Sequence, residues 1–235
     1  MIQDYVCLDL ETTGLDPKTD KIIEIGAIRV KGGEIVGSFQ SFVNPGRLLS
    51  EKVKELTGIS DEDLFLAPSI EEVLPEFLEF AEDACFLGHS VLFDYSFMKK
   101  AVVNSDKENK YERMGIDTLK IARKHLKGLE SRRLSYLCEY YGIEQTAHRA
   151  MEDAVATHQL YLKLIEHFYK GNEDDFVPLK LIYNVKRETP ITKAQKERLS
   201  KLITLHKIEN YYDIDRLTRN EASRITDQIL ATYGR

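Results

Sequence analysis

Three extended segments within the first 43 residues constrain the fold more than any other feature of this sequence. Apolar residues alternate with other residues along 5–10, 21–30 and 35–43, which is the period-two pattern of β-strands. A short glycine-rich turn, KGGE at 31–34, separates the second segment from the third. Strands this close together in the chain pair with one another, so we expect an antiparallel meander to open the fold.

Helical and extended patterns alternate after this meander. Ser69 and Glu72 form a capping-box sequence, which predicts that a helix begins there. The expected helices cover residues 70–81, 92–103, 119–126, 134–141 and 149–169, and the expected short strands cover residues 85–87 and begin at 116–117. Strands first, followed by alternating helices and strands, predict an α/β fold with a mixed sheet flanked by helices.

The character of the sequence changes after residue 170. A polar break at 171–175 leads into an apolar stretch at 176–185, which we interpret as extended. Two further capping-box sequences then precede amphipathic stretches, at Thr192 with Gln195 and at Thr218 with Glu221. We therefore expect a main domain at 1–170, a linker at 171–189 and a small helical module at 190–235.

Composition excludes several classes of protein. Charged residues make up 31% of the 235-residue chain, and no apolar run approaches the ~18–20 residues that span a bilayer. The three cysteines are far apart and odd in number, which disfavours a disulfide framework or a structural zinc site. We expect a soluble, cytoplasmic protein with no membrane segment.

Two carboxylates, Asp9 and Glu11, occupy alternate positions of the first extended segment. Their side chains therefore leave the same face of the predicted sheet, while Val6, Leu8 and Leu10 leave the other. Carboxylate oxygens are ligands that a hard cation such as Mg²⁺ prefers. Taken alone, such a pair is more often simply a solvated strand face, so the interpretation depends on the rest of the chain.

Further candidates lie at three predicted helix starts. Asp94 falls in the first turn of one helix, where it could also simply complement the helix dipole. Asp117 could cap another helix or support a metal site from behind, and we favour the supporting role. His148 and Asp153 flank the start of the longest helix. Five helical positions correspond to a rotation of about 140°, so both side chains can face one site only if His148 precedes the helix.

Together these segments resemble a known family of nucleases. The ordered set DLETTG, HSVLFD, IDTLKIAR and HRAMEDA resembles the motifs of the DEDD superfamily of 3′→5′ exonucleases, histidine subtype. The similarity covers residues 3–168, and the chain most resembles the proofreading epsilon subunit of bacterial DNA polymerase III and the exonuclease domain of the Gram-positive replicative polymerase. The tyrosine subtype would carry a tyrosine where this chain has Arg149.

The resemblance implies a ribonuclease H-like fold, two Mg²⁺ or Mn²⁺ ions and release of nucleoside monophosphates. By position, Asp9, Glu11, Asp94 and Asp153 correspond to metal-binding acids and His148 to the general base. A histidine titrates near neutral pH and can therefore accept a proton from a metal-bound water.

Substrate contacts are expected around these acids. The expected partner is nucleic acid, as single-stranded or frayed 3′ ends of DNA, with terminal bases stacked or wedged by apolar side chains. Ser90 replaces the asparagine that is usual in the second motif and reaches less far. The expected substrate-binding residues are Thr12, Thr13, Gly14, Leu15, Thr57, Gly58, His89, Ser90 and Phe93.

Two alternatives stay open at this stage. The same motifs serve exonucleases that act on RNA, and nothing in them excludes contact with a 2′-hydroxyl. The fold could also serve as a non-catalytic scaffold associated with a polymerase. The module at 190–235 could bind a DNA polymerase, a single-strand binding protein or DNA itself, or it could simply pack against the main domain.

Overall fold

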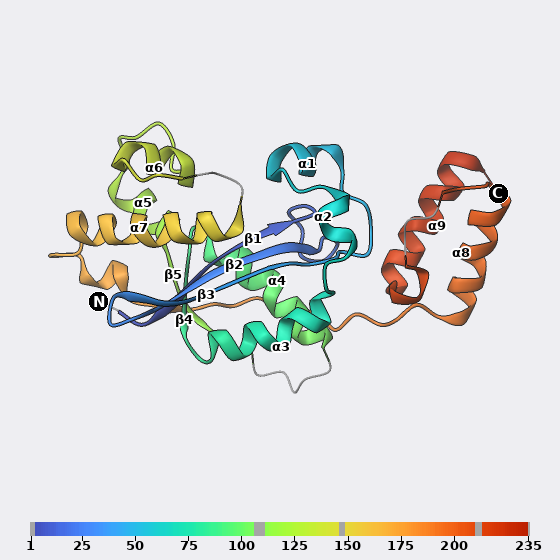
Figure 1. Cartoon of the computed structure of the whole chain (residues 1–235), viewed down its shortest axis with the longest axis horizontal. Helices are drawn as coiled ribbons and strands as arrows, with labels where there is room; N and C mark the ends of the chain where they lie inside the picture. The colour runs from blue at the N-terminus through green and yellow to red at the C-terminus, as the bar shows by residue number, and fades with distance from the viewer. Residues whose placement is uncertain (1–2, 106–110, 146–148, 210–212, 235) are drawn as a thin grey trace.

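A mixed six-stranded sheet forms the centre of the protein, in the order β3-β2-β1-β4-β5-β6 (Figure 1). The computed structural model describes residues 3–105, 111–145, 149–209 and 213–234. The strands are β1 (Tyr5–Thr12), β2 (Ile22–Lys31), β3 (Glu34–Phe42), β4 (Cys85–Gly88), β5 (Met114–Asp117) and β6 (Leu179–Lys180). This sheet confirms the predicted α/β fold class.

The strand pairing confirms the predicted meander. Strand β2 pairs antiparallel with both β1 and β3, whereas β4 runs parallel to β1 and to β5. In the β1–β2 register Asp9 lies opposite Gly26, and Glu11 lies opposite Glu24. The two acids of the first motif therefore have fixed neighbours on β2.

Helices cover both faces of the sheet. Val6, Leu8 and Leu10 of β1 face a core shared with α3 (Ile70–Ala81) and α4 (Val91–Asn104). The opposite face, with Tyr5 and Cys7, packs against α5, α6 and α7. These three helices span Thr118–His125, Leu134–Tyr141 and Ala150–Phe168. Asp9 and Glu11 leave β1 on the face covered by α7, because side chains alternate along a strand.

Two short helices were not expected from the sequence. Helix α1 (Glu51–Thr57) begins at Ser50, whose hydroxyl accepts from Val53 N, and α2 (Asp61–Phe65) begins with a capping box at Ser60. Each is too short to show the apolar periodicity on which helix prediction depends.

The chain between α7 and the last helices stays attached to the main body. The stretch expected as extended at 176–185 forms only the short strand β6, after a 3₁₀ turn at Glu173–Phe176. Leu181 is buried in the core against α4 and β5. Further on, Glu188 pairs with Lys100 at 3.2 Å and exchanges two hydrogen bonds of 3.0 Å with Asn104.

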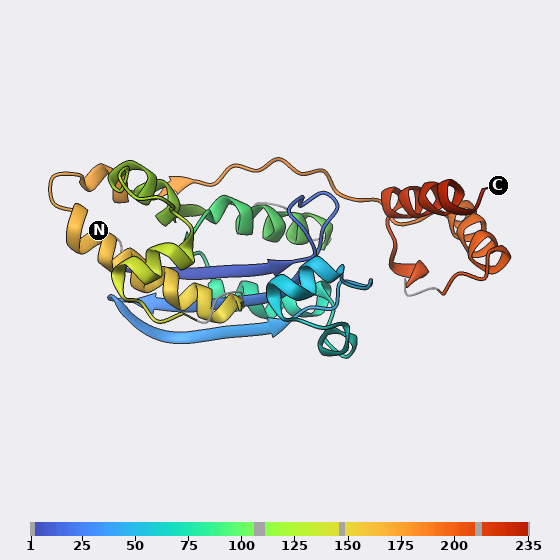
Figure 2. The same cartoon turned by 90° about the horizontal axis from the view of Figure 1, so that it is seen from above.

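Two amphipathic helices end the chain, as predicted, and lie beyond one end of the sheet (Figure 2). Helix α8 (Lys193–Leu205) and helix α9 (Arg219–Tyr233) both begin with the expected capping boxes and share a small core. Lys21 Nζ lies 2.9 Å from Glu221 Oε1 and joins α9 to the main body. Burial opposes ionisation of Glu221, but the Lys21 ammonium and the Thr218 cap lower its pKa to about 2. Among the helices that the structure describes, none has the length and apolar character needed to cross a membrane.

Candidate active site

Three carboxylates converge between β1 and the first turn of α7. Asp9 and Glu11 come from β1, and Asp153 comes from α7. One carboxylate oxygen from each of the three lies within 4.8 Å of the others. The sequence therefore correctly predicted that acids far apart along the chain would meet.

Asp94 completes the group from α4. Its Oδ1 accepts a hydrogen bond of 3.2 Å from Leu10 N, between the two acids of β1, and its side chain is buried. After burial, the charge of Asp94 is the largest contribution that raises the pKa of Asp9. Asp94 therefore lies beside the β1 acids, although it is outside the group of three whose oxygens lie within 4.8 Å of one another.

The cluster is electrostatically unfavourable without a cation. Burial, and then repulsion from Asp94 and Asp153, raises the pKa of Asp9 well above its usual value. Burial, and then repulsion from Asp153 and Glu24, raises the pKa of Glu11 to about 7. Oxygen donors that are held close together while they repel one another suit a hard divalent cation. The residues present therefore fit the metal site that the family resemblance implies.

A pH-dependent stability follows for the metal-free protein. Between pH 4.5 and about 7, Glu11 keeps its proton in the folded state and loses it when the chain unfolds, so stability should fall as pH rises. In EDTA, we expect a lower melting temperature at pH 8 than at pH 6, and added Mg²⁺ or Mn²⁺ should give its larger increase at pH 8. Thermal melts measure this, and Glu11→Gln should flatten the EDTA profile. A larger metal effect at pH 6 would contradict the account.

A buried glutamate on β2 holds the start of α7 in place. Glu24 is fully buried, and its carboxylate accepts from Arg149 Nη2 at 3.1 Å, from Arg149 Nε at 3.3 Å and from Ala150 N at 3.2 Å. Gln40 on β3 donates a further bond of 3.0 Å. A buried charge with this many partners orients what it binds. Glu24 thus fixes the turn of helix that carries Asp153.

The backbone of α7 also approaches β2 more closely than any side chain would allow. A Cβ atom added at Gly26 would lie 2.1 Å from Met151 N and 2.2 Å from the carbonyl carbon of Ala150. Gly26 lies directly opposite Asp9 in the sheet. The absence of a side chain at this position therefore sets the distance between the β1 acids and Asp153.

Some residues at the site were missed by the sequence analysis. Gln145 Nε2 donates a short hydrogen bond to Asp153 Oδ1, and Glu24 and Gly26 position α7. One signal was present, because Glu24 interrupts the apolar run at 22–28, and a charge in a buried strand needs a partner. Gln145 offered no comparable signal, since it lies in a loop of ordinary polar composition.

The second motif is held together by hydrogen bonds. Asp117 caps α5, where its Oδ1 accepts from Leu119 N and Lys120 N, and the same atom accepts from Ser90 N at 3.0 Å. This places Asp117 behind α4, as a supporting role would require. His89 was expected to contact substrate, yet its ring nitrogens lie 2.9 Å from Thr118 Oγ1 and 2.8 Å from Arg132 O. A substrate contact through either nitrogen would break one of these bonds.

Ser90 adopts a backbone conformation that explains why asparagine is usual at this position. Its φ of 80° and ψ of 41° are left-handed, where asparagine is several-fold enriched among residues other than glycine. We expect Ser90→Asn to stabilise the protein by about 0.5–1 kcal/mol, seen as a higher melting temperature. Ser105→Asn is the matched control, because Ser105 ends the same helix with an ordinary φ of −80°. Equal effects of both changes would contradict this explanation.

Four of the remaining predicted substrate residues lie in two places, the loop after β1 and helix α1. Thr13, Gly14 and the strongly exposed Leu15, 84% accessible, form the loop that follows β1. Thr57 is instead buried and donates to Val53 O, so its hydroxyl is engaged within α1. Leu56, beside it, is 53% exposed and is the residue of that helix with an available apolar surface.

The last three predicted substrate residues all contribute to local structure. Thr12 donates to Gly14 O, and Gly58 ends α1 in the left-handed conformation. Phe93 packs on Phe97 with ring centroids 5.0 Å apart, at the edge of the core. His148, the predicted general base, lies outside the described residues.

Comparison with known proteins assigns this chain to a family. A family model described as Exonuclease matches residues 6–161, which include Asp9, Glu11, Asp94 and Asp153. The chain belongs to this exonuclease family. The family resemblance found in the motifs is thereby confirmed.

Relatives of this chain include bacterial DNA polymerase III proteins. It is 39% identical over 178 residues to the DNA polymerase III subunit epsilon of Aquifex aeolicus, and the match covers 75% of this chain and 88% of that protein. It is 37% identical over 231 residues to the PolC-type DNA polymerase III of Thermotoga maritima, covering 92% of this chain but 16% of that protein. The chain spans only a small part of its PolC-type relatives.

Solved structures with the same fold include two exonucleases. Exonuclease X in complex with 5′ overhanging duplex DNA aligns with a TM-score of 0.56 at 23% identity, over 70% of this chain and 92% of that chain. Escherichia coli Exonuclease I in complex with an oligonucleotide aligns with a TM-score of 0.63 at 20% identity, over 74% and 43% of the two chains. These likenesses confirm the ribonuclease H-like fold.

Proposed function

We propose that this protein is a 3′→5′ exonuclease that acts on single-stranded or frayed ends of DNA and releases nucleoside 5′-monophosphates. The observation that carries the proposal is the cluster of Asp9, Glu11 and Asp153, beside which Asp94 of α4 accepts a hydrogen bond from Leu10 N, between the two acids of β1. The likeness to an epsilon subunit along 88% of its length supports a role in proofreading or repair.

Two divalent cations, Mg²⁺ or Mn²⁺, are the proposed cofactors. Asp9, Glu11 and Asp153 would hold one, and Asp9 together with Asp94 would hold the second. When bound, such a pair of cations lowers the pKa of a water and neutralises charge that develops on the phosphodiester. This role gives a reason for a site in which burial and mutual repulsion raise the pKa of Asp9 and of Glu11.

The side chains around the acids have distinct proposed roles. His148 accepts the proton of the attacking water, and Glu24 with Arg149 keeps α7 and Asp153 in position. Leu15 and Leu56 expose apolar surface that can stack against the terminal base and favours an unpaired 3′ end.

The proposed organisation keeps three parts. Residues 1–170 form the exonuclease domain, which the family match at 6–161 supports. Residues 171–189 connect it to the helical module at 190–235, although β6 and Leu181 within this connection belong to the body.

A gel assay tests the proposed function. A 5′-labelled single strand of DNA, the same strand paired with a mismatched 3′ end, and a matched RNA are incubated with Mg²⁺, Mn²⁺ or EDTA. We expect a metal-dependent ladder that shortens from the 3′ end of DNA and is absent with Asp153→Asn. Faster degradation of RNA would overturn the substrate assignment, and intact strands under every condition would overturn the enzymatic one.

A further inference from the structure

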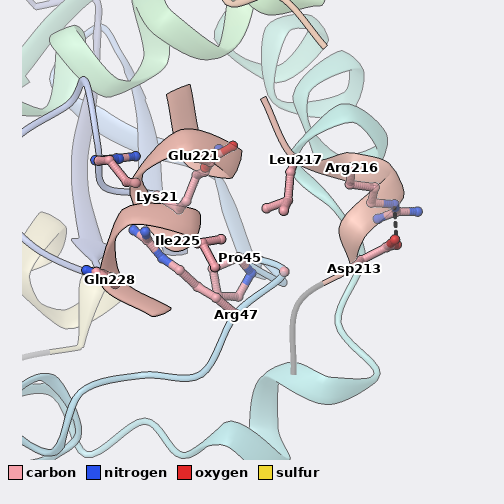
Figure 3. Close-up of a pocket in the computed structure, with 11 residues that line it drawn as sticks. Lys21, Pro45, Arg47, Asp213, Arg216, Leu217, Glu221, Ile225 and Gln228 are labelled. Atoms are coloured by element: carbon pink, nitrogen blue, oxygen red, sulfur yellow. Dashed lines mark ion pairs between the residues drawn. The ribbon is translucent and has the colours of Figure 1, made fainter. Parts of the chain in front are cut away.

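A cleft lies between the exonuclease body and the C-terminal helices (Figure 3). It encloses about 210 Å³ and is open to solvent. The body contributes the residues around the β1–β2 and β3–α1 loops, and the module contributes the turn before α9 and α9 itself as far as Gln228. The lining residues are Lys21, Pro45, Gly46, Arg47, Asp213, Arg216, Leu217, Glu221, Arg224, Ile225 and Gln228.

The cleft is positively charged although the whole chain carries a net charge of −6. Four basic side chains line it, against two acidic ones. Glu221 is neutralised by Lys21 at 2.9 Å, and Asp213 by Arg216 at 3.3 Å. Arg224 has no ion-pair partner among the residues that the structure describes. Arg47 shares its guanidinium group with Asp20 Oδ1 at 3.3 Å, so among the described lining residues Arg224 is the one whose cationic charge remains for a ligand.

The cleft adjoins the predicted substrate loop. Arg47 Nη2 donates to Thr13 Oγ1 at 2.5 Å and to Thr19 O at 3.0 Å. Lys21 N donates to the same Thr13 hydroxyl at 3.0 Å, and Lys21 O accepts from Thr13 N at 2.9 Å. Two of the four basic residues of the cleft are thus the direct neighbours of Thr13, two positions after Glu11.

We propose that this cleft binds the phosphodiester backbone of the single strand on the 5′ side of the scissile bond, a proposal that rests on the proposed exonuclease function. Guanidinium groups match phosphate oxygens in charge and geometry, and such contacts hold a strand without reading its sequence. A strand whose 3′ end lies at the acids can pass over the β1–β2 loop and place a phosphate between Arg47 and Arg224.

The neighbouring cavity limits where the strand binds. A larger space of about 660 Å³ shares Lys21, Pro45, Gly46, Arg216 and Leu217 with the cleft. Acidic side chains outnumber basic ones there, by five to four. Repulsion disfavours a phosphate in that larger space, so the site is confined to the smaller cleft.

The test compares long and short substrates. Arg224→Gln and the double variant Arg216→Gln/Arg224→Gln are assayed in the full chain, beside Arg198→Gln. Arg198 is the matched control, since it is exposed on α8 and lies outside the cleft. Each variant receives a 20-nucleotide DNA strand and a chromogenic aryl ester of thymidine 5′-monophosphate, which fills the catalytic site but has no upstream phosphate.

We expect Arg224→Gln to raise KM for the 20-nucleotide strand about fivefold, because a partly exposed contact between two charges contributes only modestly to the binding free energy. Activity on the small ester should stay unchanged. The slope of log affinity against log salt should decrease by about 0.7 for each arginine removed. Arg198→Gln should behave as the wild type on both substrates.

Failure of this inference and failure of the proposed function give different results. If the wild type hydrolyses neither substrate, the exonuclease proposal fails. If the wild type hydrolyses both and Arg224→Gln matches Arg198→Gln, the cleft does not bind the strand. Equal losses on both substrates would also overturn the inference, because the change would then act on the catalytic site.

Discussion

Gly26→Ala should reduce exonuclease activity about 100-fold or more. The new methyl carbon would lie 2.1 Å from Met151 N, so the start of α7 has to move by about 1 Å to relieve the overlap. Asp153 stands in this turn, and a displacement of about 1 Å in a catalytic group can cost about 10²-fold in rate. The overlap is with backbone atoms, which cannot change rotamer, so we also expect about 3 kcal/mol of destabilisation, at the upper end of overpacking effects.

Gly37→Ala provides the control for this change. Gly37 lies on β3, and a methyl group there would meet Phe80 Cε2 at 3.6 Å, an ordinary contact. Initial rates on single-stranded DNA and urea unfolding curves measure both variants. Activity of Gly26→Ala within threefold of Gly37→Ala would show that the distance between β1 and α7 does not control the site.

Asp9→Asn should lose more activity than His148→Ala. A general base contributes about 10²–10⁴-fold, whereas Asp9 is proposed to bind both cations, so its removal should exceed that range. The two losses also differ in kind. His148→Ala should change the pH dependence of the rate, and Asp9→Asn should abolish turnover at every pH.

The melting temperature of each variant shows whether a loss of activity comes from the missing catalytic group or from unfolding. Asp9 is buried beside Asp94, and burial followed by their repulsion raises its pKa. Asn at position 9 removes that repulsion, so the metal-free variant should melt at a higher temperature than the metal-free wild type. Asp174→Asn, an exposed acid after α7, should leave both activity and melting temperature unchanged. Wild-type turnover by Asp9→Asn would overturn the metal assignment, and wild-type pH dependence of His148→Ala would overturn the base assignment.

The parts of the fold that depend on regular local patterns could be predicted from sequence. Alternation along β1 and β2, and the capping boxes at Ser69, Thr192 and Thr218, all gave elements where they were expected. The four carboxylates could be predicted as a group because they occur together in motifs that resemble those of the exonuclease family. Helix α1 could not, since one short turn of helix depends on capping by Ser50 and packing of Val53.

The residues that position the site could not be predicted from local sequence patterns. Glu24 forms its bonds with Arg149 and Ala150 across 125 and 126 residues, and such pairs have no local signature. The need for a glycine at position 26 becomes visible only in the structure, where the backbone of α7 packs directly against it. The sequence could also not show that His89 would satisfy both ring nitrogens within the fold.

The order in which the acids occur along the chain has a consequence for biosynthesis. Cys7 Sγ donates to Ala154 O across 147 residues, so the first strand meets α7 only after most of the domain exists. Contacts this distant in sequence form late, because closing a long loop costs entropy before any contact compensates for it. A nascent chain that has left the ribosome only as far as α6 therefore holds Asp9, Glu11 and Asp94 without Asp153. Such a chain should be unable to degrade nucleic acid around the ribosome, and nuclease activity should appear only when α7 docks.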